Sequence, residues 1–450
     1  MEKGLEKKYG LPTAICMVVG IVIGSGVFFK AEAVLKNTGG NMPLGILAWL
    51  IVGAIMIVCS YVFATMATRY EKVNGLVDYA EATVGRRYAY LIGWFMATIY
   101  TPALTSVLAW VSARYFSVLM GWDITGGSCM TLAAFFLCGD YALNALSPRI
   151  AGKIQVSTTV IKMIPLLLMA VVGTIVGLTS GQMTQNFATA ATATVSTGAG
   201  LMKSTVAVAF AYEGWILATS INAELKDAKK NLPRALVLGS FIVVVTYILY
   251  YIGLNGVVTT EELMASGEAA AKMAFQRAFG DAAGTAVFVL IVISCLGTLN
   301  GLMLANCRSF YAMAARGQGV RPELFGTVDP VTNMPTNSAI LSLLFAGFWL
   351  LYFYGANLTA GWFGPFCFDS SELPIITLYG MYVVMFIQFM RREKELNGFK
   401  RFVMPALGLC GCLFMVYAAF AGYGVKVFYY LAVYAVFMLV GNCFYRKNAG

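Results

Sequence analysis

The sequence predicts an all-α membrane protein with twelve transmembrane helices in a single domain, residues 1–450. Three observations predict this fold class: 59% of the 450 residues are hydrophobic, only 12% are charged, and apolar runs fill almost the whole chain. Soluble proteins carry about 25% charged residues. We expect the first apolar run to be a retained helix rather than a cleaved signal peptide, because the residues before it are polar and no small-residue cleavage site follows.

The predicted spans are apolar segments of about 20 residues or more, the length that crosses a bilayer as a helix. Twelve segments satisfy this criterion: 11–34, 42–68, 88–119, 128–146, 154–178, 199–223, 235–258, 282–314, 336–354, 359–390, 402–423 and 426–445.

The distribution of basic residues predicts the orientation of these spans. With the amino terminus inside, 23 of the 31 Lys and Arg residues lie in segments or span ends on the inner side, 7 lie in those on the outer side, and Lys162 lies further inside a span. The positive-inside rule then places both termini in the cytoplasm of a protein of the plasma (inner) membrane. The net charge of +10 follows from this asymmetry, so we expect lipid as the surrounding partner and no nucleic acid.

The residues that usually build redox and metal centres are missing or scattered. The chain has no His, and its ten Cys residues form no CxxC pair. Metal and haem sites rely on clustered Cys or on imidazole ligands. We therefore expect no metal, no cofactor and no catalytic residues, which disfavours a membrane-embedded enzyme.

The first span contains the stretch GIVIGSGVF, residues 20–28. Each glycine costs a helix about 1 kcal/mol of intrinsic propensity relative to alanine. One interpretation is close helix packing through the pair Gly20 and Gly24, which form a GxxxG face. The other is a helix that opens at this point. Span six has a similar weak point, because Glu213 and a glycine interrupt the apolar run VAVAFAYEGWILATS, residues 206–220.

Spans one and six begin two blocks of five predicted spans. The first block covers residues 11–178 and the second covers 199–390, while 402–445 holds two peripheral helices. Paired broken helices at equivalent positions are typical of inverted-repeat transporters, whose substrate site lies between them near the bilayer midplane. The free N–H groups of one half-helix attract a carboxylate, and free carbonyls of the other accept hydrogen bonds from an ammonium group. A free amino acid carries both groups.

Lys162 is an ionisable residue inside predicted span five, with no acidic residue within a helical turn. A charged side chain at this depth is expensive, and by default it indicates a functional role. The alternative is a lysine that extends its ammonium group to the membrane surface.

Taken together, IGSGVF in span one, FAYEGW in span six, the following ELKDAKKNLPRA and Lys162 resemble the bacterial branch of the L-type amino acid transporters. This family belongs to the amino acid–polyamine–organocation superfamily. The resemblance implies the leucine-transporter fold, with five plus five inverted-repeat helices and two extra ones, and exchange of amino acids without sodium.

The resemblance also assigns roles to individual residues. It implies that the substrate carboxylate meets the backbone of Gly24, Ser25 and Gly26. Lys162 is similar to a lysine of the family whose ammonium group lies where related sodium-driven transporters bind their cation, and Tyr247 corresponds to a tyrosine near that lysine.

On the other side of the substrate, the resemblance implies that the ammonium group meets carbonyl groups at Val22 and around Phe210 and Ala211. Phe210 also resembles the family's aromatic gate above the bound substrate. Asn300 fits a pattern in span eight and is expected to act in helix packing or hydrogen bonding.

Glu213 departs from the family, whose members carry Gly, Ala or Asp at this position. The acid either faces the substrate and favours cationic amino acids, or it turns away and accepts hydrogen bonds. We favour the second alternative, and with it an antiporter of small neutral L-amino acids such as Ala, Ser, Cys and Thr. A proton-coupled symporter with Lys162 or Glu213 as the titrating group is the competing hypothesis. The resemblance implies that eukaryotic members of the family pair with a heavy-chain glycoprotein through a cysteine after span three. Cys129 lies near that region but in the apolar setting GGSCMTL, so we expect no obligate heavy-chain subunit. We expect a monomer.

Overall fold

The computed structural model describes residues 10–70, 75–189, 197–216, 225–359 and 361–446. Its α-helices in chain order are α1 (Leu11–Val22), α2 (Gly26–Asn37), α3 (Met42–Arg69), α4 (Leu76–Thr83), α5 (Arg86–Phe95), α6 (Thr101–Met120), α7 (Gly127–Leu146), α8 (Pro148–Ile161), α9 (Met163–Leu168), α10 (Thr174–Ser180), α11 (Gln182–Thr189), α12 (Thr197–Ala211), α13 (Ala228–Val257), α14 (Thr260–Ser266), α15 (Glu268–Phe279), α16 (Asp281–Asn306), α17 (Ser309–Ala314), α18 (Pro322–Phe325), α19 (Thr336–Phe353), α20 (Leu373–Arg392), α21 (Met404–Tyr423) and α22 (Lys426–Cys443). Short π or 3₁₀ segments adjoin them: η1 (Met96–Tyr100), η2 (Met169–Gly173), η5 (Tyr354–Leu358), η6 (Gly364–Phe366) and η7 (Phe399–Val403).

The expected all-α membrane fold class is confirmed. In the part of the chain that the structure describes, ten helices are long and apolar enough to cross a membrane, or eleven if α1 and α2 count as one bent span. The number twelve is not confirmed, because predicted span 199–223 is represented by α12 and residues 217–224 lie outside the described residues. The division into repeats 11–178 and 199–390 with peripheral helices 402–445 stays a prediction.

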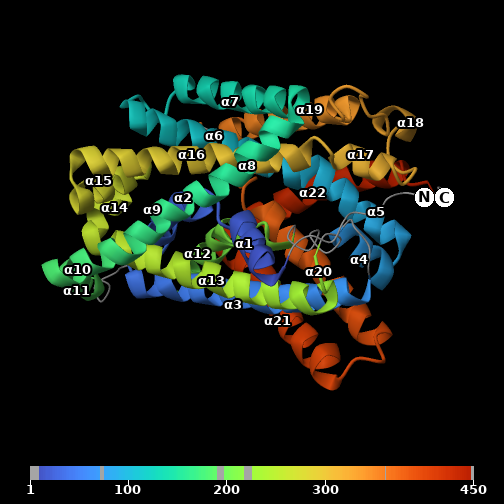
Figure 1. Ribbon diagram of the computed structural model, residues 1–450, viewed down its shortest axis with the longest axis horizontal. Coiled ribbons are helices and arrows are strands. Elements are labelled where there is room, and N and C mark those ends of the chain that lie inside the picture. The colour runs from blue at the N-terminus through green and yellow to red at the C-terminus, as the bar shows by residue number, and fades with distance from the viewer. Residues whose placement is uncertain (1–9, 71–74, 190–196, 217–224, 360, 447–450) are drawn as a thin grey trace.

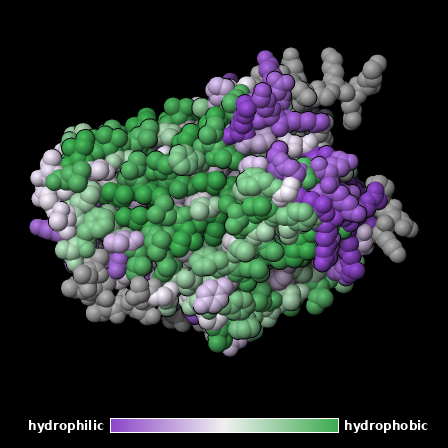
Figure 2. All heavy atoms as spheres, turned by 90° about the horizontal axis from the view of Figure 1, so that it is seen from below, coloured by the Kyte–Doolittle hydropathy of each residue, from purple (hydrophilic) through white to green (hydrophobic). Residues whose placement is uncertain are grey.

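The long helices run along the longest axis of the molecule (Figure 1). Figure 2 shows a broad hydrophobic band, with hydrophilic side chains gathered mainly at the end where α4, α5 and α18 lie. Large apolar side chains are exposed on several helices, among them Phe135 on α7 at 68% and Leu344 on α19 at 64%. Such an exposed apolar belt fits contact with lipid. We call the opposite end, where α14 and α15 lie, the distal side.

One predicted span contains local irregularities and another begins later than expected. Predicted span 154–178 lies within one long helix, Ile150–Ser180, in which α8, α9, η2 and α10 follow one another. Pro165 lies in the first turn of α9 and lacks the N–H that would continue the hydrogen bonding of α8. Predicted span 359–390 begins only at Leu373, since residues 361–372 form turns and the short segment η6, with positive φ angles at Gly361 and Gly364.

A row of glycines brings α13 into backbone contact with η2 and α10. A Cβ atom at Gly177 would lie 2.5 Å from the Cα of Gly256, and one at Gly173 would lie 2.6 Å from the carbonyl oxygen of Gly253. All four residues are buried. Small residues at a helix interface allow this close approach, and we call the contact the glycine seam.

Candidate functional site

The first membrane span is broken at the glycine-rich stretch. Helix α1 ends at Val22, α2 begins at Gly26, and their axes differ by 51°. Ile23 has an extended backbone, with φ −68° and ψ 111°. The first N–H groups of α2 and the last carbonyls of α1 therefore lack the partners that a continuous helix would supply. The prediction that this stretch opens the helix is confirmed.

The end of α12 lies directly against this break. A Cβ atom at Gly26 would lie 2.7 Å from the Cα of Ala211, the last residue of α12. Shortly after, Gly214 has a φ of +105°, and a Cβ there would lie 3.2 Å from the carbonyl oxygen of Ile21. Glycine is required at both positions, because a side chain would separate the two chain segments. The two weak points thus lie against each other, as expected. A substrate site between them stays a prediction.

The residues at this junction are buried. Ser25 is 0% exposed, Ala211 2% and Phe210 7%. The hydroxyl oxygen of Ser25 has no hydrogen-bond partner among the residues that the structure describes. A buried hydroxyl without a partner is unfavourable, and this one adjoins the first N–H groups of α2. The break therefore places a side-chain hydroxyl without a partner beside the first N–H groups of α2.

Lys162 lies between α8 and α9 and points into the protein. Its Nζ donates a hydrogen bond of 2.6 Å to the carbonyl oxygen of Gly20 in the last turn of α1, and the residue is 2% exposed. The ammonium group thus contacts the backbone at the end of α1, next to the break. Its role in transport stays a prediction.

Tyr247 on α13 holds the same end of α1. Its hydroxyl donates to the carbonyl oxygen of Val22 at 3.1 Å and also interacts with the backbone of Gly24. Its ring stacks on Tyr212 at a centroid distance of 5.2 Å. A carbonyl oxygen has two lone pairs. Tyr247 occupies one of them at Val22, so the other can still accept a hydrogen bond.

Glu213 turns toward the helix pair η1 and α6. Its Oε1 accepts a hydrogen bond from the hydroxyl of Tyr100, the last residue of η1. Sequence reasoning did not find Tyr100, because a tyrosine within an apolar span carries no pattern that points to a partner 113 residues away. The bond is the kind of structural contact that one of the two interpretations of Glu213 requires.

Phe210 belongs to an aromatic layer that covers the break on the distal side. The ring centroids of Phe210 and Phe29 lie 6.1 Å apart and those of Phe29 and Trp110 lie 5.6 Å apart, both edge to face. The rings of Trp110 and Phe353 are tilted, with centroids 5.0 Å apart. These four residues, which we call the aromatic layer, come from α2, α12, α6 and α19. They join both broken segments to two unbroken helices.

Asn300 lies away from the break, between α16, α7 and α8. Its side-chain nitrogen donates to the carbonyl oxygen of Ala151 at 3.0 Å, and its oxygen accepts from Asn144 at 3.0 Å. These contacts fit the expected helix-packing role.

Three comparisons relate the sequence and the structure of this chain to known proteins. A family model described as amino acid permease matches residues 9–441. The serine/threonine exchanger SteT of Bacillus subtilis (strain 168) is 31% identical over 427 residues, which are 92% of this chain and 91% of that protein. The b(0,+)-type amino acid transporter 1 of Mus musculus is 26% identical over 450 residues, 98% of this chain and 88% of that protein.

Among solved structures, the crystal structure of MhsT in complex with L-phenylalanine is similar with a TM-score of 0.57 and 14% sequence identity, and the match covers 95% of this chain and 100% of that one. This similarity supports the leucine-transporter fold. The resemblance found in the sequence motifs is confirmed, and the relatives are transporters rather than enzymes. The chain therefore belongs to the amino acid permease family.

Proposed function

We propose that the protein is a sodium-independent exchanger of small neutral L-amino acids, such as Ala, Ser, Cys and Thr, that works by alternating access. The observation that carries the proposal is the contact between the break at residues 23–25 and the end of α12. The carboxylate of the substrate binds the N–H groups at Gly24, Ser25 and Gly26. A helix N-terminus favours such an anion through its free donors and its dipole.

The substrate ammonium group binds carbonyl groups at Val22 and around Phe210 and Ala211, which end α1 and α12. Ser25 is buried, and Phe210 lies over the break on the distal side. Both features support a small substrate. SteT, which is similar over 92% of this chain, is a serine/threonine exchanger, and this supports a substrate of the same size.

Lys162 supports the absence of a sodium requirement. Its ammonium group donates to the Gly20 carbonyl, so a fixed cation of the protein already binds the end of α1. A mobile sodium ion is then not needed to stabilise these backbone dipoles.

We further propose that the protein lies in the plasma membrane with both termini in the cytoplasm, so that the distal side is extracellular. The excess of basic residues in the segments on the side of the termini supports this orientation. We propose a monomer without a heavy-chain subunit as the working unit.

A counterflow experiment tests the function. Purified protein in liposomes is preloaded with each standard amino acid in turn, and the entry of labelled serine is measured. We expect internal Ala, Ser, Cys and Thr to stimulate entry, and replacing sodium with choline to leave the rate unchanged. If a pH gradient drives accumulation into liposomes without internal amino acid, the protein is a proton-coupled symporter and the proposal fails.

A second prediction concerns Glu213. The carboxylate of Glu213 accepts a hydrogen bond from Tyr100, and Glu213→Gln keeps an acceptor but removes its charge. We expect this weakening of the bond to slow exchange, by about tenfold at most. We expect the ranking of competing amino acids to remain the same. The measurement is inhibition of serine exchange by Lys, Arg, Ala and Thr.

Tyr100→Phe is the matched control, because it removes the donor of this hydrogen bond and leaves the carboxylate of Glu213 in place. Both variants should lose rate in parallel. A Glu213→Gln protein that loses affinity for Lys or Arg and keeps affinity for Ala would instead show that the carboxylate faces the substrate.

A further inference from the structure

An apolar groove lies between the last three long helices and the start of α5. It has a volume of about 360 Å³, and among the described residues its lining comes from α5, α20, α21 and α22. Ligand sites in proteins have volumes of about 300 to 1,000 Å³. The broken segments α1, α2 and α12 do not contribute to this lining, so the groove is separate from the proposed substrate site.

Three of the four hydroxyl groups in the lining are already used by the protein. The hydroxyl of Tyr88 donates to the carbonyl oxygen of Met381 at 2.8 Å. Thr377 donates its only hydroxyl proton to the carbonyl oxygen of Leu373 at 3.0 Å, so it accepts from the hydroxyl of Tyr430, 2.7 Å away. The groove therefore offers little to a polar ligand and suits a hydrocarbon chain.

The helices α21 and α22, which form the two walls of the groove, face the lipid. Among the ten candidate spans in the described part of the chain, α22 is the least buried, with 17% of its residues buried. Phe428 on α22 is 62% exposed, and Leu413 on α21 is 51% exposed. Apolar cavities exclude water and bind apolar molecules. Within a bilayer, the hydrocarbon chains of lipids surround these walls and are available to fill the groove.

The length of the groove matches one leaflet of the membrane. Its lining on α22 runs from Val427 to Met438, which are eleven residues apart, or about 16 Å along a helix. The hydrocarbon core of a bilayer is about 30 Å thick, so one leaflet measures about 15 Å. One acyl chain of a single lipid therefore reaches along the whole groove.

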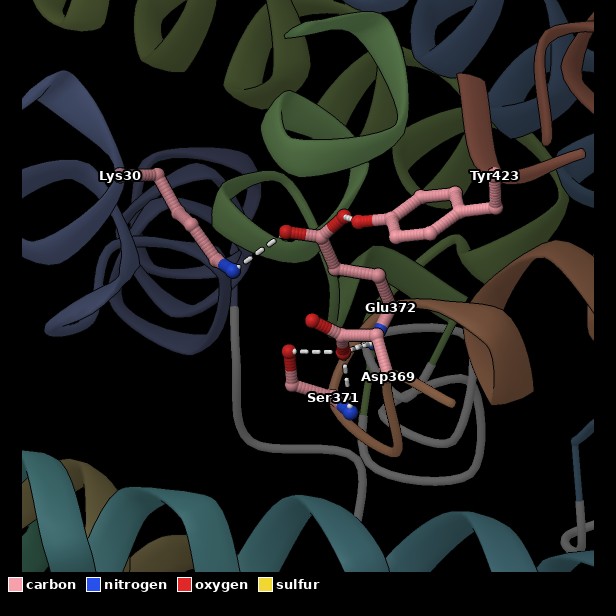
Figure 3. Close-up of polar contacts among 5 residues, drawn as sticks. All are labelled: Lys30, Asp369, Ser371, Glu372 and Tyr423. Atoms are coloured by element: carbon pink, nitrogen blue, oxygen red, sulfur yellow. Dashed lines mark hydrogen bonds and ion pairs between the residues drawn. The ribbon is translucent and has the colours of Figure 1, made fainter. Parts of the chain in front are cut away.

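The distal end of the groove is bridged. The hydroxyl of Tyr423 at the end of α21 donates to Oε2 of Glu372, which precedes the first residue of α20 (Figure 3). These two residues adjoin the last lining residues on their helices, Phe420 and Leu373. The bridge joins α20 to α21 at the distal side, so the other end of the groove is the one suited to a lipid headgroup.

A basic residue lies at that other end. Arg87 adjoins the lining residue Tyr88, and its Nε and Nη2 donate to Oδ1 of Asn442 at 3.1 and 2.8 Å. Asn442 follows the lining residue Met438 by about one helical turn on α22. Arg87 is exposed, and these contacts use two of its five N–H groups. The remaining N–H groups match the oxygen atoms of a phosphate group, which arginine binds well.

We propose that this groove binds one anionic phospholipid, with an acyl chain along α22 and the phosphate group at Arg87. An anionic headgroup is favoured over one that adds an ammonium group, because the guanidinium group repels a second cation. The lipid comes from the leaflet opposite the distal side, which is cytoplasmic in the orientation proposed above. It fills the space between the two peripheral helices and holds them against α20.

Native mass spectrometry of the purified full-length protein tests the binding. The protein is mixed with equal amounts of phosphatidylglycerol and phosphatidylethanolamine, and we expect one phosphatidylglycerol to remain bound when other lipids dissociate. Gly380→Leu should lower its affinity about tenfold, the loss expected when about two methylene groups are displaced. Gly380 lines the groove, and a Cβ there would lie 3.8 Å from the side chain of Val416 on α21. Gly347→Leu on α19, where a Cβ meets nothing within 4 Å, is the matched control and should change nothing.

Arg87→Gln tests the contact with the phosphate group. We expect the affinity for phosphatidylglycerol to fall about fivefold, the upper range for an exposed ion pair, and that for phosphatidylethanolamine to change less. Arg87→Lys keeps the charge and should recover part of the affinity. Lys153→Gln removes an exposed charge from α8 and should have no effect. Equal binding of the two lipids by the parent and by Arg87→Gln would overturn the assignment of the headgroup.

Photochemical labelling of the parent protein locates the lipid without any substitution. Phosphatidylglycerol with a diazirine in the middle of one acyl chain is irradiated with the protein in liposomes, and the labelled peptides are identified. We expect label at residues that line the groove, such as Ile376, Val416 and Leu431. This readout does not involve amino acid transport, so it stands whether or not the proposed exchange is found.

Three results would overturn the acyl-chain site. The first is label spread over the exposed faces of α7 and α19 as strongly as over the groove. The second is unchanged affinity for phosphatidylglycerol in Gly380→Leu and Val416→Phe proteins that fold, as judged by a monodisperse elution profile. The third is a dimeric parent protein that Gly380→Leu converts to monomers, because a second copy of the chain then occupies the groove.

Discussion

Gly26→Val is expected to abolish amino acid exchange in a protein that still folds. A Cβ atom at Gly26 would lie 2.7 Å from the Cα of Ala211, so any side chain there separates α2 from the end of α12. The neighbour is backbone and cannot rotate away. A displacement of about 1 Å at a pre-organised site lowers a rate by about 100-fold. The measurement is serine counterflow together with the melting temperature of the purified protein.

The matched control is Gly139→Val on α7, where a Cβ atom meets nothing within 4 Å. It adds the same β-branched side chain to a membrane helix and should leave exchange close to the parent value. Ser25→Ala should be milder than Gly26→Val, because the backbone donor at residue 25 survives. Normal exchange by the Gly26→Val protein would show that the contact between α2 and α12 is not the substrate site.

Lys162→Ala is expected to produce the second largest loss. It removes the ammonium group that donates to the Gly20 carbonyl and leaves that buried acceptor without its partner. A hydrogen bond to a charged group contributes about 1.5 to 3 kcal/mol, which corresponds to a factor of about 10 to 100 in the population of a state. We expect the exchange rate to fall by such a factor, measured by counterflow, while the melting temperature changes little.

Lys153→Ala provides the control, since Lys153 is an exposed lysine on the same helix, α8. It should be neutral. Lys162→Gln keeps a donor without the charge and should recover only part of the rate. If sodium accelerates the parent protein strongly, or if Lys162→Gln and Lys162→Arg are both as active as the parent, the ammonium group does not act in place of a cation.

The broken first span was predictable because its cause is local. Three glycines and a serine within GIVIGSGVF weaken a helix wherever they stand, and the observed break at residues 23–25 falls inside this stretch. The inward orientation of Lys162 was predictable for a related reason, because a charge inside an apolar run needs a partner. The all-α fold class followed from composition and from the lengths of the apolar runs.

The buried ion pair of Lys30 with Glu372, whose Nζ and Oε1 atoms lie 2.5 Å apart, was not predictable. Lys30 belongs to the basic residues on the outer side and Glu372 to predicted span 359–390, so neither indicates the other across 342 residues of sequence. The contact of Tyr100 with Glu213 was missed in the same way. Such pairs depend on which helices become neighbours, and a single sequence carries no record of this. The end of span six was not testable, since residues 217–224 lie outside the described residues.

The glycine seam between α13 and the segment formed by η2 and α10 has a mechanical consequence. Helices that touch through bare backbone have no interlocking side chains that must change rotamer when one helix slides along the other, so the seam is suited to shear. The same smoothness makes it intolerant of added volume. A single methyl group at Gly177 would meet the Cα of Gly256 at 2.5 Å, and it would wedge the two helices apart along their length rather than fill a space.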